Sequence, residues 1–337
     1  MQNFCARLAI LLAIFLLGGF CLQEAKAELV PLHVGHASVN SRMAPLWVAA
    51  QQGFFKKQGF DVRVVSIRGG TQVTQALLGG GLDIAYSDPP ATIAAVAAGA
   101  PLVEIMATAT VMPYYLLGAP AVKTLADLKG KRVGSSGLGL SASRLALLVA
   151  FKQLGLDPER DKITLVAAGT EPERLAGLAS GALAGTVIAP EFRARIEQLG
   201  LNVLADLRQM PIPWEVGNVV TSRKFLQTQR DGVERAVKAL LEGNAYVLNP
   251  TYRSQLLEVL KIRLGLKTTQ DAVGAYDDTV KYYVLKKPYP YREGLQSILT
   301  EVRRTLPAAA SLKYEDIADR SIVEKLDKSG YIDGLYR

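Results

Sequence analysis

The sequence is poor in the side chains that carry most protein chemistry, because its 337 residues include only two cysteines and two histidines. Both cysteines, Cys5 and Cys21, fall within the first 27 residues. A chain that loses this segment has no thiol, which excludes disulfides and thiolate chemistry. His33 and His36 lie three residues apart on or beside an expected strand. Side chains at this spacing point to opposite faces of a strand, so we expect structural roles for them and no shared metal.

Motifs of the common hydrolases and nucleotide-binding enzymes are also absent. The sequence holds no HExxH, CxxC, GxSxG or GxxxxGK(S/T) pattern, so zinc, nucleophilic and P-loop chemistry have no visible carrier. The formal net charge is +8, but lysines and arginines are scattered among acids, apart from the pairs Lys56-Lys57 and Lys286-Lys287. This pattern predicts a solvated basic surface and no nucleic-acid binding. We expect no cofactor.

Long apolar runs are absent beyond the first 27 residues. An uncharged apolar run over residues 8–22 follows Arg7 and precedes Ala25-Lys26-Ala27, which matches the small-x-small pattern that signal peptidase requires. The run is about 15 residues, shorter than the roughly 18 to 20 that span a bilayer. We therefore predict a secretory signal peptide over residues 1–27, cleaved after Ala27. An uncleaved N-terminal anchor is the alternative.

What the sequence does contain is a regular alternation of short β-like runs with helical patterns between residues 32 and 219. This alternation predicts an α/β protein with mainly parallel sheets. Beyond Lys224 long helical patterns dominate, at residues 232–248, 254–264 and 269–284. A chain of this length is sufficient for about two domains of ordinary size.

An internal sequence similarity suggests that the two domains are similar lobes. Residues 80–89 and 181–190 each have a glycine turn, a leucine that starts a short strand, and a closing proline; any α/β unit would also produce this pattern. The glycines and proline near 118–120 and 216–218 suit hinge segments. We therefore expect lobe I to comprise residues 28–118 and 219–337, and lobe II to comprise residues 119–218.

A Gly/Ser loop before an expected helix is the first candidate for ligand binding. Residues 137–142 fit the dinucleotide pattern GxGxxG/A, but Asp157, the acid at the required distance, precedes the next strand and does not end it. The same loop places free N–H groups and hydroxyls at a helix N-terminus, which suits an anionic or polar ligand group. A plain helix cap by Ser141 is the alternative. The candidate residues of the loop are Ser135, Ser136, Gly137, Leu138 and Ser141.

Other polar residues follow expected strands, where ligands of open α/β sheets gather. Arg42 is suited to an anion such as a carboxylate or sulfonate, or else is a solvated surface arginine. Asp88 and Glu191 favour an amine or another hydrogen-bond donor, and Trp214 is a candidate apolar wall. The remaining candidates of this kind are Ser41, Gly70, Thr71, Ser87 and Thr110.

One segment carries a family resemblance. Residues 45–62, PLWVAAQQGFFKKQGFDV, resemble the opening of the nitrate, taurine and aliphatic-sulfonate binding proteins of ABC importers, in which a helix leads to G-F-F-x-x-x-G and a strand. The resemblance continues through Gly70-Thr71, residues 82–85 and residues 125–134, and covers roughly residues 32–225.

The resemblance implies a type II periplasmic-binding fold, with two α/β lobes that close over a ligand in the cleft between them, and a helical C-terminal tail. It implies a monomeric periplasmic protein that is not an enzyme and whose partners are the permease and ATPase subunits of an importer. The sequence departs from the family at Leu183-Ala184-Gly185, which lacks the usual aspartate. By position, the resemblance places Ser41, Arg42, Thr71, Asp88, Thr110, Ser136, Leu138 and Trp214 in the cleft.

The ligand class has more than one interpretation. Arg42, the Gly/Ser loop and the net basic charge favour a small anion such as a sulfonate, nitrate or carboxylate. Similar proteins also include binders of thiamine-pyrimidine precursors, which are neutral heterocycles, and enzymes that make that pyrimidine. Those enzymes carry a cysteine-rich motif, whereas this chain has no cysteine beyond Cys21. An exported enzyme on the same fold is the remaining alternative.

Overall fold

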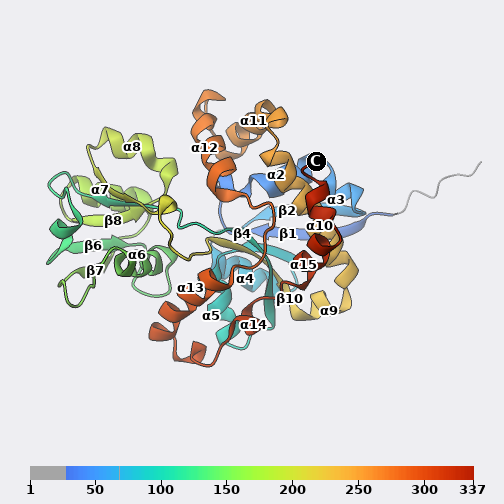
Figure 1. Ribbon diagram of the computed structural model, residues 1–337, viewed down its shortest axis with the longest axis horizontal. Coiled ribbons are helices and arrows are strands. Elements are labelled where there is room, and N and C mark those ends of the chain that lie inside the picture. Colours follow the sequence, from blue (N-terminus) through green and yellow to red (C-terminus); the bar gives the residue numbers. More distant parts are fainter. Residues whose placement is uncertain (1–27, 68) are drawn as a thin grey trace, which may run out of the picture.

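The computed structural model describes residues 28–67 and 69–337. The expected signal peptide and its cleavage site lie outside these residues. The described chain forms two five-stranded sheets that lie side by side, each packed against helices (Figure 1). The expected α/β class with two α/β units is confirmed.

The first sheet has the strand order β2-β1-β3-β10-β4. Strands β1, β2 and β3 are mutually parallel, and β10 runs antiparallel to both of its neighbours. The carboxyl ends of β1, β3 and β4 and the start of β10 therefore meet at one edge. The strands are β1 (Val30–His36), β2 (Phe60–Ser66), β3 (Ile84–Ser87), β4 (Leu102–Ala109) and β10 (Gly217–Ser222).

The second sheet repeats this plan with the order β7-β6-β8-β5-β9, in which β5 is antiparallel to both neighbours. The two similar sequence segments, residues 80–89 and 181–190, contain β3 and β8, which occupy the same position in their sheets. The lobe limits at residues 118 and 219 stay a prediction. The strands are β5 (Tyr115–Gly118), β6 (Arg132–Ser135), β7 (Thr164–Ala167), β8 (Gly185–Ile188) and β9 (Asn202–Asp206).

Helices fill the connections and the tail. Within the described residues, no helix has both the length and the apolar character needed to cross a membrane. The helices are α2 (Ala44–Gln51), α3 (Phe54–Lys57), α4 (Gly70–Leu78), α5 (Pro89–Ala97), α6 (Ala142–Gln153), α7 (Glu171–Ala179), α8 (Arg193–Gln198), α9 (Arg223–Thr228), α10 (Arg230–Leu248), α11 (Arg253–Leu264), α12 (Val273–Asp278), α13 (Arg292–Thr305), α14 (Tyr314–Ile317), α15 (Ser321–Lys328) and α16 (Tyr331–Gly334).

The helical pattern expected over residues 269–284 is present, but it does not form one regular α-helix. The segment divides into a 3₁₀ turn, the short helix α12 and a π turn, Thr279–Tyr283. The hydroxyl of Thr279 donates to the carbonyl of Ala275 at 2.7 Å and lies 3.3 Å from the carbonyl of Ser41. The side chain of Thr279 thus contacts a distant loop at the start of the π turn, which a local pattern does not reveal.

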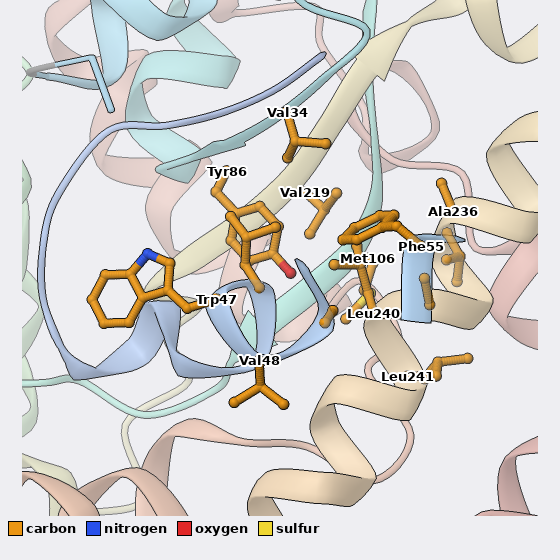
Figure 2. Packing of buried hydrophobic residues seen from close by; sticks show 14 of the residues in the cluster. Val34, Trp47, Val48, Phe55, Tyr86, Met106, Val219, Ala236, Leu240 and Leu241 are labelled. Atoms are coloured by element: carbon orange, nitrogen blue, oxygen red, sulfur yellow. The ribbon is translucent and has the colours of Figure 1, made fainter. Parts of the chain in front are cut away.

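The core of the first sheet lies between its strands and helices α2 and α10. Trp47, Phe55 and Met106 belong to this core, and Figure 2 shows Phe55 and Met106 beside Leu240 of α10. A Cβ at Gly243 would lie 2.4 Å from the carbonyl oxygen of Pro45, so α10 approaches α2 closely because residue 243 has no side chain. Trp47 of α2 is a core residue, 2% exposed.

The tail does not pack only on the first sheet. Helix α13 contacts both α5 and α6, and its buried residues Leu295, Ile298 and Leu299 share a core with Leu145 and Phe151 of α6. The C-terminal segment therefore spans the two units and helps to fix how they lie relative to each other (Figure 1).

Candidate functional site

An inner cavity of about 260 Å³ lies at the edge where the first sheet's strands end. Ser87 and Asp88 reach it from the end of β3, Thr108 from β4 and Gly217 from β10, while Ala142 comes from the start of α6 in the second unit. Strand ends of open α/β sheets are the usual position of ligand sites. The cavity is lined by Ala37, Ser38, Arg42, Met43, Gly69, Gly70, Ser87, Asp88, Pro90, Thr108, Tyr114, Ala142, Trp214, Glu215, Val216 and Gly217.

An outer cavity of about 890 Å³ adjoins it, since Ser38 and Arg42 line both. Its walls come from the loop after β1 and from α12 on one side, and from α7 and α8 on the other. Carboxylates outnumber cations on these walls, because two arginines, Arg42 and Arg193, face six acids. The six acids are Glu171, Glu191, Glu197, Asp271, Asp277 and Asp278.

Arg42 lies between the two cavities on a short 3₁₀ turn, Ser41–Met43, which Asn40 caps by accepting from the N–H of Arg42. Its guanidinium is 4.0 Å from the carboxylate of Glu191 and stacks over the ring of Tyr283, 5.5 Å from the ring centroid. The charges of Arg42 and Glu191, which favour opposite kinds of ligand, therefore partly neutralise each other across the outer cavity.

Asp88 has a structural role as well as a place in the inner cavity. It caps helix α5, because its Oδ1 accepts a hydrogen bond of 3.1 Å from the N–H of Ala91. Its Oδ2 lies against Gly70, where a Cβ would come within 2.1 Å. Burial raises the pKa of Asp88. Burial thus disfavours the charged form of a carboxyl group that lines the cavity.

The rest of the inner wall combines an aromatic surface with hydroxyl groups. Trp214 is 2% exposed and forms part of the wall with Met43. Burial raises the pKa of Tyr114 to about 12, so its hydroxyl remains a hydrogen-bond donor at neutral pH. The buried hydroxyl of Thr108 has no hydrogen-bond partner among the described residues. A polar ligand could satisfy it.

The Gly/Ser loop turns its polar groups inward. The hydroxyl of Ser135 donates to the carbonyl of Gly137 at 2.9 Å, and Ser141 caps α6 by accepting from the N–H of Arg144. The backbone N–H of Ser136 donates to the hydroxyl of Ser143 at 2.9 Å. These contacts match the alternative of a structural cap. A ligand role for this loop stays a prediction.

The structure thus divides the predicted site residues into groups. Arg42, Gly70, Ser87, Asp88 and Trp214 line the inner cavity, and Ser41, Arg42 and Glu191 line the outer one. Thr110 lines a third cavity, of about 450 Å³, beside Tyr291 and Arg292. The remaining residues line none of these three cavities; they are Thr71, Ser135, Ser136, Gly137, Leu138 and Ser141.

Sequence reasoning missed several residues at or beside the inner cavity. Thr108, Tyr114 and Glu215 line it, and none belongs to a recognisable motif; Glu215 could have been suspected from its neighbour Trp214.

Arg174 of α7 was also missed. It is 2% exposed, and its guanidinium donates to the hydroxyl of Ser143 at 3.0 Å and lies 3.8 Å from Glu171. No cluster of three or more metal-ligating side chains occurs in the described part of the chain.

Two sheets of matching topology with cavities between them define the class, a protein of type II periplasmic-binding fold. Within this class, the model of the family described as NMT1/THI5 like matches residues 40–251, more than half of the sequence, and the chain belongs to this family.

Solved structures agree on the fold. The periplasmic nitrate-binding protein NrtA of Synechocystis PCC 6803 superposes with a TM-score of 0.71 at 15% identity, over 92% of this chain and 91% of NrtA. The periplasmic aliphatic sulphonate binding protein SsuA of Escherichia coli gives a TM-score of 0.66 at 21% identity, over 82% of this chain and 94% of SsuA. These likenesses establish the type II fold that the resemblance implied.

A curated relative carries a different description. The 4-amino-5-hydroxymethyl-2-methylpyrimidine phosphate synthase THI11 of Saccharomyces cerevisiae is 28% identical over 119 residues. The match covers 34% of this chain, and the chain spans about a third (34%) of the length of that relative.

Proposed function

We propose that this protein is the solute-binding component of an ABC importer and captures a small anionic or polar molecule between its two units. The observation that carries the proposal is the inner cavity, where polar groups from β3 and β4 meet the start of α6. A site built from both units allows a ligand to hold them together. The names of the nitrate-binding and sulphonate-binding proteins of similar fold support this function.

The setting of the protein follows from the same proposal. It is exported to the periplasm, loses residues 1–27 after Ala27, and delivers its ligand as a monomer to permease and ATPase subunits. The two lobes correspond to the two sheets with their helices, and the chain crosses between them after β4 and before β10. The intact mass of the exported protein tests the cleavage: a mass that includes residues 1–27 would support the uncleaved anchor.

The proposed ligand class is a small anion such as a sulfonate, nitrate or carboxylate. Arg42 supplies the cation on the wall of the inner cavity, and Tyr114 supplies a donor hydroxyl. Burial raises the pKa of Asp88 and of Glu215. Burial disfavours the charged form of both carboxyl groups, which lessens their repulsion of an anion.

A neutral heterocycle, such as a thiamine-pyrimidine precursor, is the second candidate. The observation that favours it is the carboxyl group of Asp88, which lines the cavity and has its Oδ2 atom beside Gly70. A carboxylate there could accept hydrogen bonds from an exocyclic amino group.

Calorimetric titration of protein freed of ligand by unfolding and refolding distinguishes the two candidates. The panel comprises nitrate, methanesulfonate, acetate and an aminopyrimidine. We expect binding of an anion, and a loss of about tenfold or more in its affinity in Arg42→Gln, the size of a lost charged hydrogen bond. Arg193→Gln is the matched control, because Arg193 lines only the outer cavity and pairs with Glu197. Binding of the aminopyrimidine without any anion would overturn the anion class.

We also propose that the bound molecule is not chemically converted. No cysteine lies beyond Cys21, and no metal-ligating cluster occurs in the part of the chain that the structure describes. The yeast synthase supports the opposite possibility, that of an enzyme. Mass spectrometry of the ligand that copurifies, before and after prolonged incubation with excess protein, decides between them: a changed mass means turnover.

A further inference from the structure

Two glutamates are fully buried beside the inner cavity. Glu104 lies in the middle of β4, and Glu215 lies in the segment that leads from the second sheet into β10; each is 0% exposed. Glu215 also lines the cavity next to Trp214. The ligand site proposed above does not rely on the charge of either glutamate.

Each carboxyl group has one satisfied oxygen and one unsatisfied oxygen. Oε2 of Glu104 accepts from the side-chain amide of Asn218 at 2.9 Å, and Oε2 of Glu215 accepts from the backbone N–H of Tyr291 at 2.7 Å. Oε1 of both residues is buried with no donor among residues 28–67 and 69–337. A single proton between the two groups would satisfy both orphaned oxygens at once.

The surroundings do not compensate two negative charges. No lysine or arginine of the described chain forms an ion pair with either carboxylate. The nearest polar groups on the packed elements, Thr92 of α5 and Asn218 of β10, are neutral. Two further groups, Tyr314 and Arg292, are bonded to other partners. Tyr314 of α14 donates to the carbonyl of Pro290 at 3.0 Å, and Arg292 of α13 pairs with the exposed Glu315 at 2.8 Å.

The effect on titration agrees with this geometry. Burial raises the pKa of Glu104 to about 7. Burial, together with the neighbouring Glu104, raises the pKa of Glu215 well above its usual range. The two carboxyl groups lie within side-chain hydrogen-bonding reach of each other. They therefore titrate as a pair, and the second proton is much harder to remove than the first.

We propose that Glu104 and Glu215 share one proton in a buried hydrogen bond between a carboxylic acid and a carboxylate, and that this bond positions Trp214 on the wall of the inner cavity. The O–H of one group donates to Oε1 of the other. Glu104 and Glu215 are therefore positioning residues. The inference does not depend on which molecule the cavity binds.

The pair joins three segments that are distant in sequence. Glu104 belongs to β4, Glu215 to the crossing into β10, and Tyr291 to the start of α13. The packing is tight here, because a Cβ at Gly294 would lie 2.9 Å from the backbone nitrogen of Glu215. Loss of the shared proton would place two like charges at this junction and weaken the link.

The shared proton predicts the sign of a pH effect on stability. Both groups have a higher pKa in the folded state than the ordinary value of 4.5. Their stabilising contribution is therefore complete below about pH 4.5 and is lost as pH rises through about 7 and beyond. One extra bound proton corresponds to an unfolding equilibrium constant that rises by up to about tenfold per pH unit in this window.

Carbon-13 NMR of protein labelled at the glutamate side-chain carboxyl carbon tests the pair directly. The wild type should show glutamate resonances that titrate near pH 7 or above. In Glu215→Gln the amide can donate to Glu104, so the remaining carboxylate should stay ionised through neutral pH. Absence of any glutamate titration above pH 6 in the wild type, a result that needs no variant, would overturn the proposal.

Urea unfolding between pH 5 and pH 9 gives an independent test. Glu104→Gln and Glu215→Gln should each lose the extra pH dependence of the wild type. Glu293→Gln is the matched control, because Glu293 is exposed on the same C-terminal segment, and it should keep the wild-type profile. If both buried variants also keep that profile, the two glutamates do not share a proton.

Discussion

At the scale of single residues, Gly70 determines how Asp88 meets the inner cavity. The missing side chain at residue 70 leaves the space in which Oδ2 of Asp88 lies, since a Cβ would come within 2.1 Å of that atom and 3.0 Å of the Cβ of Ala91. The same carboxyl group caps α5. Cap and cavity wall therefore depend on one glycine, and the resemblance to the importer family alone did not reveal this dependence.

We predict that Gly70→Ala displaces Asp88 and impairs both of its roles. The free energy of unfolding should fall by about 1–3 kcal/mol, the range of an overpacked interior, and ligand affinity should fall with it. Urea unfolding and calorimetric titration provide the two measurements. Gly334→Ala is the control, because a Cβ there meets nothing within 4 Å. A Gly70→Ala variant that matched this control in both measurements would mean that the contact is relieved by a small shift.

The sequence predicted part of the candidate site, for a physical reason. Arg42, Asp88 and Trp214 were identifiable because each has a distinctive side chain and a position after an expected strand or near a crossing. Thr108 and Tyr114 were not, since hydroxyl groups are common, and their place beside the cavity depends on how two units meet. Ser135 was selected for its loop, but its hydroxyl is satisfied by Gly137. The local sequence pattern shows which side chains can form hydrogen bonds to a ligand. It does not show which of them remain without a hydrogen-bond partner in the folded protein.

At the scale of secondary-structure elements, the alternation of strands and helices was predictable and the tail was not. Alternating β-like and helical patterns depend on side-chain period, which is a local property. The π turn at the end of the helical segment over residues 270–283 carries a hydrogen bond from Thr279 to Ser41, more than 200 positions away. The contact of α13 with both α5 and α6 is equally non-local.

Helix α13 provides a prediction at this scale. Its residue Gly294 lies against the backbone of the crossing segment, with a hypothetical Cβ at 2.8 Å from the carbonyl carbon of Trp214. We expect Gly294→Ala to push α13 away and to lower the free energy of unfolding by about 1–3 kcal/mol. Thermal or urea unfolding measures the change.

Gly232→Ala in α10 is the matched helical control. The contacts of a Cβ at Gly232 are at 3.9 Å, which is ordinary packing. Alanine is the better helix former by about 1 kcal/mol, so this variant should be neutral or more stable than the wild type. Equal destabilisation in both variants would show that the loss at Gly294 does not come from the close approach of α13.

At the scale of the whole molecule, two ion pairs connect the units across the outer cavity. The first, between Arg42 and Glu191, is loose at 4.0 Å. The second, between Arg208 of the second unit and Asp278 of α12, is close at 2.6 Å, and the Arg208 side chain is only 5% exposed. Arg208 also stacks over Tyr282, 4.6 Å from the ring centroid. The close pair is therefore the stronger candidate for holding the units together.

We predict that Asp278→Asn loosens the two units without unfolding either of them. Arg208 keeps its pair with Asp206 at 2.8 Å and its hydrogen bond to Tyr115 at 2.9 Å, so the second unit retains its own contacts. Loss of one charged hydrogen bond, about 1.5–3 kcal/mol, should shift the molecule toward an open form. Small-angle X-ray scattering should then show a larger radius of gyration without ligand, and ligand affinity should fall about tenfold or more. Asp277→Asn is the control, because Asp277 lines the same cavity and forms no ion pair within the described residues; if the two variants scatter and bind alike, this pair does not control closure.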